Sequence, residues 1–180
     1  MIWWPTEIPT LHHGLTTLRP LQASDIPVIY EALQDPLIPL FTTIPAGYTL
    51  ANAEHFVNER SPISFMDRKE IAFAIVHDGT FAGVISHHSI NHSDHVAEIG
   101  YWMASHMRGK GIGTTAAKLI TEYGFTTMGF RRIEGIVDVE NGPSRALLIS
   151  AGYELEAIMR KKVTRIDGRQ VDMALFAKVI

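Results

Sequence analysis

The chain has 180 residues, of which 46% are hydrophobic and 19% are charged, with a formal net charge of −3 and no cysteine. This composition is typical of one globular domain with a sizeable core, and the slightly acidic balance argues against nucleic acid as a main ligand. The lack of cysteine excludes disulfides, thiolate zinc sites and a cysteine nucleophile, and it fits a cytoplasmic protein. The N-terminal residues lack the positive region of a signal peptide, and no apolar run approaches the ~20 residues of a membrane span.

The first third of the chain predicts an arm, a strand and two helices. Ser24 or Asp25 is placed to cap the first helix, and Thr49 the second, whose apolar residues recur at helical spacing. In the arm, Trp3 and Trp4 either pack on the domain's own surface or form an interface. The expected elements are the irregular arm (1–14), a strand (15–22), a helix (26–34), a proline-broken loop (35–48) and a helix (50–60).

The remainder predicts a sheet meander followed by alternating helices and strands. Asp78-Gly79 lies between two β-rich runs, which is a strong hairpin signal, and a second hairpin is expected to turn near Asp167-Gly168. The expected elements are two strands within 70–90, a strand (95–104), a long helix (112–128), a strand (131–139), a short helix (141–152) and a closing hairpin (153–180). This order predicts a mixed sheet in an α/β domain.

The stretch HMRGKGIGTTAAK, residues 106–118, combines three closely spaced glycines with basic residues at the start of the predicted long helix. A phosphate-binding P-loop requires Ser or Thr after Gly-Lys, but Gly109-Lys110 is followed by Gly111, so that motif is excluded. A relaxed dinucleotide-binding pattern fits loosely, yet it follows an antiparallel meander with too little chain after it for a doubly wound sheet. The free N–H groups and positive dipole of a helix N-terminus, with Arg108 and Lys110 nearby, predict a diphosphate site.

The pattern R-x-x-G-x-G over Arg108 to Gly113 resembles the acyl-CoA pyrophosphate loop of the GNAT acetyltransferase superfamily. The wider context AEIGYWM…RGKGIGTTA…RIEGIVDVEN-PS…AGYELE resembles its RimJ/RimL branch, which acetylates the N-termini of ribosomal proteins. The resemblance covers residues 15–179 and implies a single GNAT domain over 1–180, with a mixed, mostly antiparallel sheet of about seven strands flanked by about four helices. It also implies acetyl-CoA as cosubstrate and no metal.

By the same resemblance, backbone amides from Met107 to Thr114 face the diphosphate of the coenzyme, and the main chain of 101–104 pairs with its pantetheine arm. The residues expected to bind the cofactor are Trp102, Met103, Ala104, Met107, Arg108, Gly109, Lys110, Gly111, Ile112, Gly113, Thr114 and Asn141. Asn141 is in addition an ideal N-cap for the helix that follows it.

Glu98 and Ser144 are the candidate catalytic residues. Glu98 interrupts an apolar strand, and by the resemblance it occupies the position of the glutamate base of RimL-like enzymes. A water is expected to relay the proton to it. The alternative is that Glu98 is a surface carboxylate paired with Lys or Arg. Ser144 is the candidate proton donor to the leaving thiolate, or a polar residue of the helix terminus. Many relatives use a tyrosine for this step, and Tyr123 and Tyr153 are possible substitutes or packing residues.

Two other clusters are not expected to take part in catalysis. Four histidines (His87, His88, His92 and His95) fall within nine residues, but strand alternation places His87 and His88 on opposite faces, which disfavours a metal site. They are expected to form a polar rim of the substrate cleft. The basic run 159–169 predicts a solvated hairpin, with contact to the 3′-phosphate of the coenzyme as an alternative.

The sequence therefore predicts an acetyl-CoA-dependent N-acetyltransferase that works by direct attack in a ternary complex. The preferred acceptor is the α-amine of a protein or peptide, because at pH 7 an α-amine of pKa ~7.8 costs only ~1 kcal/mol to deprotonate, against ~4.6 for a lysine. The alternatives are a small-molecule amine (aminoglycoside, polyamine or amino acid) and a non-catalytic acyl-CoA-binding module. A second copy of the chain is a possible partner, in a homodimer. Nucleic acid and membranes are not expected partners.

Overall fold

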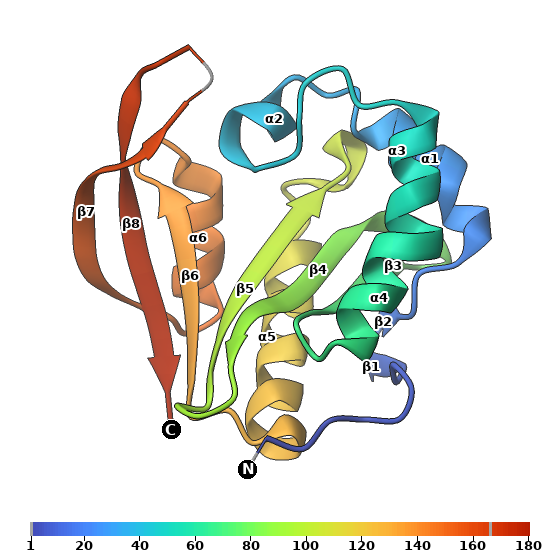
Figure 1. Ribbon diagram of the computed structural model, residues 1–180, viewed down its shortest axis with the longest axis horizontal. Coiled ribbons are helices and arrows are strands. Elements are labelled where there is room, and N and C mark those ends of the chain that lie inside the picture. Colours follow the sequence, from blue (N-terminus) through green and yellow to red (C-terminus); the bar gives the residue numbers. More distant parts are fainter. Residues whose placement is uncertain (1, 166) are drawn as a thin grey trace.

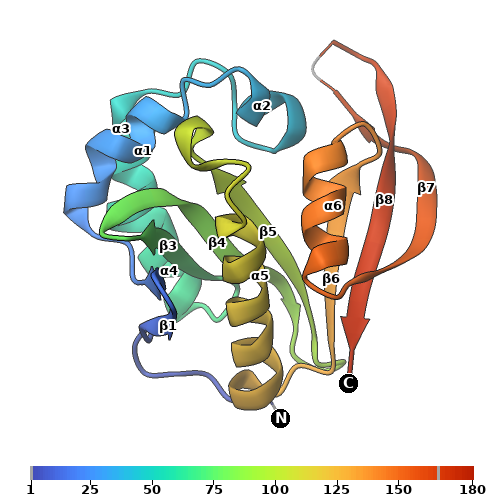
Figure 2. The same ribbon diagram turned by 180° about the vertical axis from the view of Figure 1, so that it is seen from behind.

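The computed structural model describes residues 2–165 and 167–180, and within them it contains one eight-stranded sheet with helices on both faces (Figures 1 and 2). The strand order is β1-β2-β3-β4-β5-β6-β8-β7, and only the β5–β6 pair is parallel. The strands are β1 (Leu11–His13), β2 (Thr16–Arg19), β3 (Ile71–His77), β4 (Thr80–Asn91), β5 (Val96–Met103), β6 (Arg132–Asp138), β7 (Glu154–Thr164) and β8 (Gln170–Val179).

Helices cover the two faces of the sheet in separate groups. The helices α1, α3 and α4 lie on the face seen in Figure 1, with α2 above it, and α5 and α6 lie on the opposite face, seen in Figure 2. The α-helices are α1 (Ile26–Ala32), α2 (Leu37–Phe41), α3 (Leu50–His55), α4 (Ser61–Met66), α5 (Ile112–Tyr123) and α6 (Gly142–Ser150). Short 3-10 turns form η1 (Ala23–Asp25) and η3 (Ser105–Met107), and π-turns form η2 (Phe56–Arg60) and η4 (Gly124–Met128).

Two apolar clusters hold these layers together. The larger lies between the sheet and α5 and α6, and includes Phe73, Ile120 and Phe176, all fully buried. The smaller joins α1, α2, α3 and η2 to the other face of the sheet through Val84 and Trp102. Each helix group therefore has its own apolar contact with the central strands, which fixes both faces around β4 and β5. No helix among the described residues is long and apolar enough to span a membrane.

Most of the predicted elements are confirmed. Asp78 and Gly79 join β3 and β4 with φ values of 48° and 73°, as a tight hairpin turn requires. The Thr49 hydroxyl accepts the Asn52 N–H (3.2 Å) and caps α3 as predicted. The closing hairpin of β7 and β8 also forms, although Ile166, next to the expected turn, lies outside the described residues.

Three predicted boundaries were wrong. The arm contains strand β1, which pairs with β2, and Trp4 of the arm packs on Phe65 with 5.4 Å between ring centroids. The loop 35–48 contains α2, because Pro39 lies in the first turn, where its missing N–H costs no helical bond. The helix predicted to end at residue 60 continues through η2 and α4 to Met66.

His87 is a fully buried polar residue on the α5 face of β4. Its Nε2–H donates to the carbonyl oxygen of Ile120 (3.0 Å), and its ring meets Phe130 edge-on at 5.3 Å. Nδ1 has no hydrogen-bond partner among the described residues. Burial lowers the pKa of His87 to about 4, so the native protein keeps this ring neutral.

We predict that acid destabilises the wild-type protein more than His87→Gln. Because the reference pKa of an unfolded histidine is about 6.5, the unfolded chain binds a proton that the native state does not between pH ~6.5 and ~4. The stability is therefore complete above pH ~6.5 and falls below it, by about 2 kcal/mol at pH 5. Glutamine keeps an N–H for Ile120 and does not titrate. Urea unfolding of both proteins from pH 7.5 to 5 measures the difference, and equal slopes against pH would contradict the prediction.

Candidate active site

The strands β5 and β6 separate partway along their length. They pair only from Val96 to Glu98 and from Arg132 to Glu134, although β5 continues to Met103 and β6 to Asp138. On their outer sides both strands stay paired, β5 with β4 and β6 with β8. The diverging halves of β5 and β6 therefore frame a wedge that opens toward the glycine-rich stretch and α2 (Figure 1).

The glycine-rich stretch forms the turn from β5 into α5. Gly111 is the N-cap of α5 with φ of 77°, a left-handed conformation that favours glycine. A Cβ on Gly113 would lie 2.7 Å from Cδ1 of Leu147, so this glycine allows α5 to approach α6. Among the described hydrogen bonds, the backbone N–H groups of 109–114 have no acceptor. The turn thus presents a row of unsatisfied donors at a helix N-terminus, which is the chemistry of an anion site.

The Arg108 side chain holds this turn in place. Its Nε and Nη2 donate to the carbonyl oxygen of Met103 (3.1 and 2.8 Å), and its Nη1 lies 2.7 Å from Oδ2 of Asp35. Asp35 lies just before α2, so one guanidinium links β5, the turn and the helical layer on the other side of the sheet. Lys110, the other basic residue of the motif, is exposed, and no ion pair of its side chain occurs among the described residues.

The start of α6 brings a serine and a tyrosine together. The side-chain oxygen of Asn141 accepts the N–H of Ser144 (3.2 Å), which confirms Asn141 as the N-cap. The Ser144 hydroxyl is hydrogen-bonded to the hydroxyl of Tyr101 on β5 (2.7 Å). Burial raises the pKa of Tyr101 to about 12, so this pair stays protonated at neutral pH.

Glu98 lies where β5 and β6 begin to separate. It is half-buried, and this burial, together with the nearby Glu134, raises the pKa of its carboxyl, whereas His88 and Lys162 oppose the rise. A raised pKa makes the carboxylate a stronger proton acceptor than an exposed one. Its cross-strand partner in the β4–β5 ladder is His88.

These groups line one cleft of about 1460 Å³, which runs through the wedge from one face of the sheet to the other. The predicted site residues that line it are Glu98, Trp102, Met103, Met107, Arg108, Gly109, Gly111, Ile112, Gly113, Thr114, Asn141 and Ser144. Ala104 and Lys110 do not: Ala104 is buried and its N–H donates to Ala82 (2.9 Å), and Lys110 points to solvent. The cleft is thus lined both by the turn with its unpaired N–H groups and by the carboxylate of Glu98.

Sequence reasoning missed two side chains in the cleft, and the two tyrosines that it offered as substitutes for Ser144 lie outside it. Tyr101 and His88 both line the cleft, and the Tyr101 hydroxyl is hydrogen-bonded there to Ser144. The sequence predicted a role only for the main chain of Tyr101, and it predicted His88 only as part of a polar rim. Tyr123 and Tyr153 do not line the cleft; the Tyr153 hydroxyl bonds to Thr121 (2.7 Å). Strand alternation gave the correct faces of His87 and His88, and the described residues contain no group of three metal-ligating side chains.

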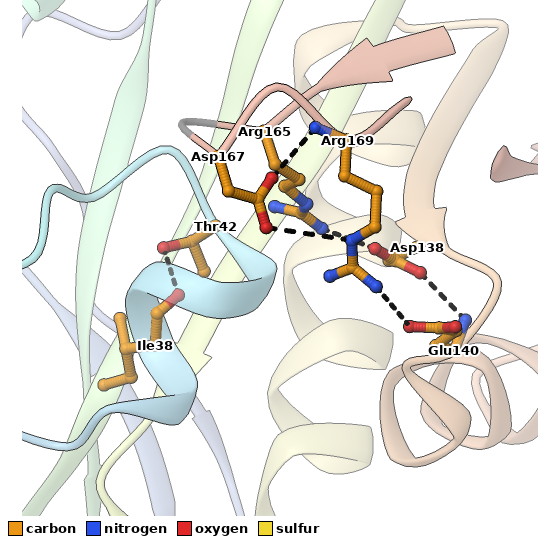
Figure 3. Close-up of polar contacts among 7 residues, drawn as sticks. All are labelled: Ile38, Thr42, Asp138, Glu140, Arg165, Asp167 and Arg169. Atoms are coloured by element: carbon orange, nitrogen blue, oxygen red, sulfur yellow. Dashed lines mark hydrogen bonds and ion pairs between the residues drawn. The ribbon is translucent and has the colours of Figure 1, made fainter. Parts of the chain in front are cut away.

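The tip of the β7–β8 hairpin borders the mouth of the cleft. In Figure 3, Arg165 and Arg169 reach toward Asp138 and Glu140, in the segment that leads into α6. Arg165 pairs with the buried carboxylate of Asp138, whose other oxygen accepts the N–H of Glu140 (2.9 Å). The helix α2 lies across from this tip. The basic hairpin is thus tied to the start of α6, and Lys162 and Arg165 face the cleft.

The family model, the related sequences and the similar solved structure described below are all acetyltransferases. Residues 16–154 match the family described as the acetyltransferase (GNAT) domain. A putative ribosomal N-acetyltransferase of Bacillus subtilis, YdaF, is 30% identical over 113 residues, covering 63% of this chain and 61% of that protein. The spermidine N(1)-acetyltransferase of Escherichia coli is 34% identical over 90 residues, covering 50% and 48%. The crystal structure of the microcin C7 self-immunity acetyltransferase MccE with acetyl-CoA and AMP superposes with a TM-score of 0.85 at 27% identity, covering 93% of this chain and 94% of that one.

We predict that Arg108→Ala destabilises the fold by about 2 kcal/mol, whereas Lys110→Ala changes the free energy of unfolding by less than about 0.5. Removing the guanidinium leaves the Met103 carbonyl and the Asp35 carboxylate without their partner. Lys110, two residues away and exposed, is the matched control for loss of one positive charge. Urea unfolding measures both variants, and an equal loss in both would show that Arg108 does not hold the turn.

Proposed function

Because the chain belongs to the GNAT acetyltransferase family and is an acetyl-CoA-dependent N-acetyltransferase, we propose that it acetylates the α-amine of a peptide or protein. The observation that carries this proposal is the continuous cleft, which is lined both by the turn with its unpaired N–H groups and by Glu98, a half-buried carboxylate without a salt-bridge partner among the described residues. A weak carboxylate base suits an amine whose own pKa is near neutrality.

The wedge and its turn fit the coenzyme. Acetyl-CoA carries a diphosphate, and the unpaired N–H groups of 109–114 at the N-terminus of α5 match its charge. The pantetheine arm would lie along the half of β5 that has left β6, directing the thioester toward the space between Glu98 and Tyr101. A backbone N–H of β5 there would polarise the thioester carbonyl.

Deprotonation of the amine and protonation of the leaving thiolate are then carried out by different side chains. Glu98, on one side of β5, is the carboxylate base that accepts a proton from the attacking amine, and its raised pKa makes it a stronger acceptor than an exposed carboxylate. On the other side, the Tyr101–Ser144 pair is hydrogen-bonded and protonated, and so can donate a proton to the departing thiolate. Either hydroxyl can give its proton to the thiolate, and it then regains a proton from the other hydroxyl through the hydrogen bond between them.

The charges in the cleft favour an α-amine over a polyamine. Of the carboxylates among the described residues, only Glu70 and Glu98 line the cleft, and Glu70 is already paired with Arg60 (3.0 Å). A polycation would need several acceptors along its length, whereas a peptide N-terminus brings one charged amine to one carboxylate. Residues of α2 and of the β7–β8 hairpin both line the cleft, and the two segments lie across from each other in Figure 3. The rest of a peptide can leave the cleft between them.

We predict that a lysine-free peptide with a free N-terminus is acetylated at least about 100-fold more efficiently at pH 7 than spermidine or an N-terminally blocked peptide with one lysine. The ~3.5 kcal/mol difference in deprotonation cost between the two kinds of amine accounts for this ratio. Thiol release measures kcat/KM for each acceptor, and mass spectrometry locates the acetyl group. A preference for spermidine or for the lysine side chain would overturn the proposed acceptor.

A further inference from the structure

The His88 ring covers the backbone of Gly100 on the floor of the cleft. His88 and Glu98 are direct partners in the β4–β5 ladder, so their side chains leave the sheet on the same face. A Cβ placed on Gly100 would lie 2.6 Å from Nε2 of His88, and its three nearest atoms would all belong to this ring. From its position opposite Glu98, the His88 ring therefore extends diagonally across the strand pair and lies over Gly100. The absence of a side chain at Gly100 makes room for it.

The two nitrogens of this ring have different surroundings. Nδ1 is hydrogen-bonded to the Ser89 hydroxyl (3.0 Å), whereas Nε2 has no partner among the described hydrogen bonds and lies over Gly100. When Nδ1–H donates to Ser89, Nε2 carries the lone pair that can accept a proton. His88, Glu98 and Gly100 all line the same cleft. Nε2 thus lies beside Gly100, which is two residues from Glu98 on the same strand. This is also the part of β5 that is proposed to hold the thioester.

We propose that His88 is a catalytic residue, which takes the proton from the acceptor ammonium while Glu98 stabilises the imidazolium that forms. The inference rests on the proposed function and deepens it, since it replaces a water between the amine and Glu98 by a side chain. An imidazole, with a reference pKa of about 6.5, matches an α-amine more closely than a carboxyl at about 4.3 does.

Charged groups from every neighbouring element act on this pair. Glu134 on β6 raises the pKa of the Glu98 carboxyl, whereas His88 and Lys162 on β7 lower it. On the helical side, Arg60 of η2 and Glu70 before β3 are paired with each other, and Lys69 is paired with Asp67 (2.7 Å), so these contribute little net charge. His87 is buried on the opposite face of β4. Glu98 is therefore the carboxylate that directly faces His88 in the ladder.

The acceptor nitrogen loses two protons in the reaction, and the leaving sulfur gains one. The ammonium gives one proton to Nε2 of His88, which releases it to solvent through the open cleft. The nitrogen lone pair attacks the thioester carbonyl carbon, the carbon–sulfur bond breaks, and the thiolate leaves with the bonding electrons. The second proton is lost from the nitrogen as the amide forms, also to His88, and the Tyr101–Ser144 pair supplies the proton that makes the free thiol. His88 then releases its second proton to solvent and the Tyr101–Ser144 pair takes one up, so each turnover releases one proton in total.

The first test is the pH dependence of kcat/KM for His88→Gln, with His13→Gln as control, because His13 is exposed on β1 and does not line the cleft. Loss of a general base typically costs ~10²–10⁴-fold. We expect about a 100-fold loss of kcat at pH 7 in His88→Gln, an unchanged KM for acetyl-CoA, and a deficit that shrinks above pH 8 as the acceptor deprotonates by itself. His13→Gln should match the wild type. A His88→Gln enzyme with the wild-type rate and pH profile would overturn the proposal.

A double-mutant cycle separates chemistry from packing. Gly100→Ala pushes its methyl group against the His88 ring, so alone it should lower kcat by at least about tenfold. In the His88→Gln background, where a flexible amide that can move aside replaces the rigid ring, the same change should cost less than about threefold. Equal losses in both backgrounds would show that Gly100 does not act through His88, and would count against the proposed ring position.

A final measurement needs no turnover. The carboxyl resonance of Glu98 should titrate at higher pH in His88→Gln than in the wild type, because His88 lowers the pKa of that carboxyl. An unchanged titration would overturn the His88–Glu98 pairing. If the wild type acetylates no amine yet Glu98 shifts in this way, the proposed acceptor fails and the pairing stands. If the wild type acetylates a peptide and Glu98 does not shift, the acceptor stands and the role of His88 fails.

Discussion

The separation of β5 from β6 is the constraint on which the rest of the molecule depends. Parallel strands usually exchange hydrogen bonds along their length, but here pairing stops at Glu98 and Glu134. Each strand remains fixed by its outer neighbour, so the wedge is held open by the sheet itself. Buried backbone groups that face the wedge need partners. An extended ligand with amide groups, such as a pantetheine arm, supplies them.

Two ion pairs stabilise the opposite walls of the wedge. Arg108 and Asp35 tie the anion-binding turn to the segment before α2, and Arg165 and Asp138 tie the hairpin tip to the start of α6. Both pairs join parts of the chain that are far apart in sequence, and both carboxylates are largely buried. Such pairs are costly to break on one side only, so they fix where the turn, Asn141 and Ser144 stand relative to β5.

The sequence predicted the parts of the fold that depend on local chemistry. The Asp78-Gly79 turn, the Thr49 cap and the glycine-rich start of α5 each follow from what those residues do to the backbone at their own positions. The helix α2 was missed because Pro36 and Pro39 indicate a loop unless they fall in the first turn, and β1 because three residues carry no alternation signal. The Tyr101–Ser144 bond and the His88 ring over Gly100 arise from tertiary contacts, which spacing along the chain does not encode.

The central claim is that the turn before α5 binds the diphosphate of acetyl-CoA through backbone N–H groups. Amide hydrogen exchange, measured residue by residue by NMR with and without saturating acetyl-CoA, tests it most directly. Exchange of the amides of 109–114 should slow by at least about tenfold on binding, because donors that lack a partner in the free protein gain one. Tight binding of acetyl-CoA with no protection of these amides, and protection elsewhere, would contradict the claim.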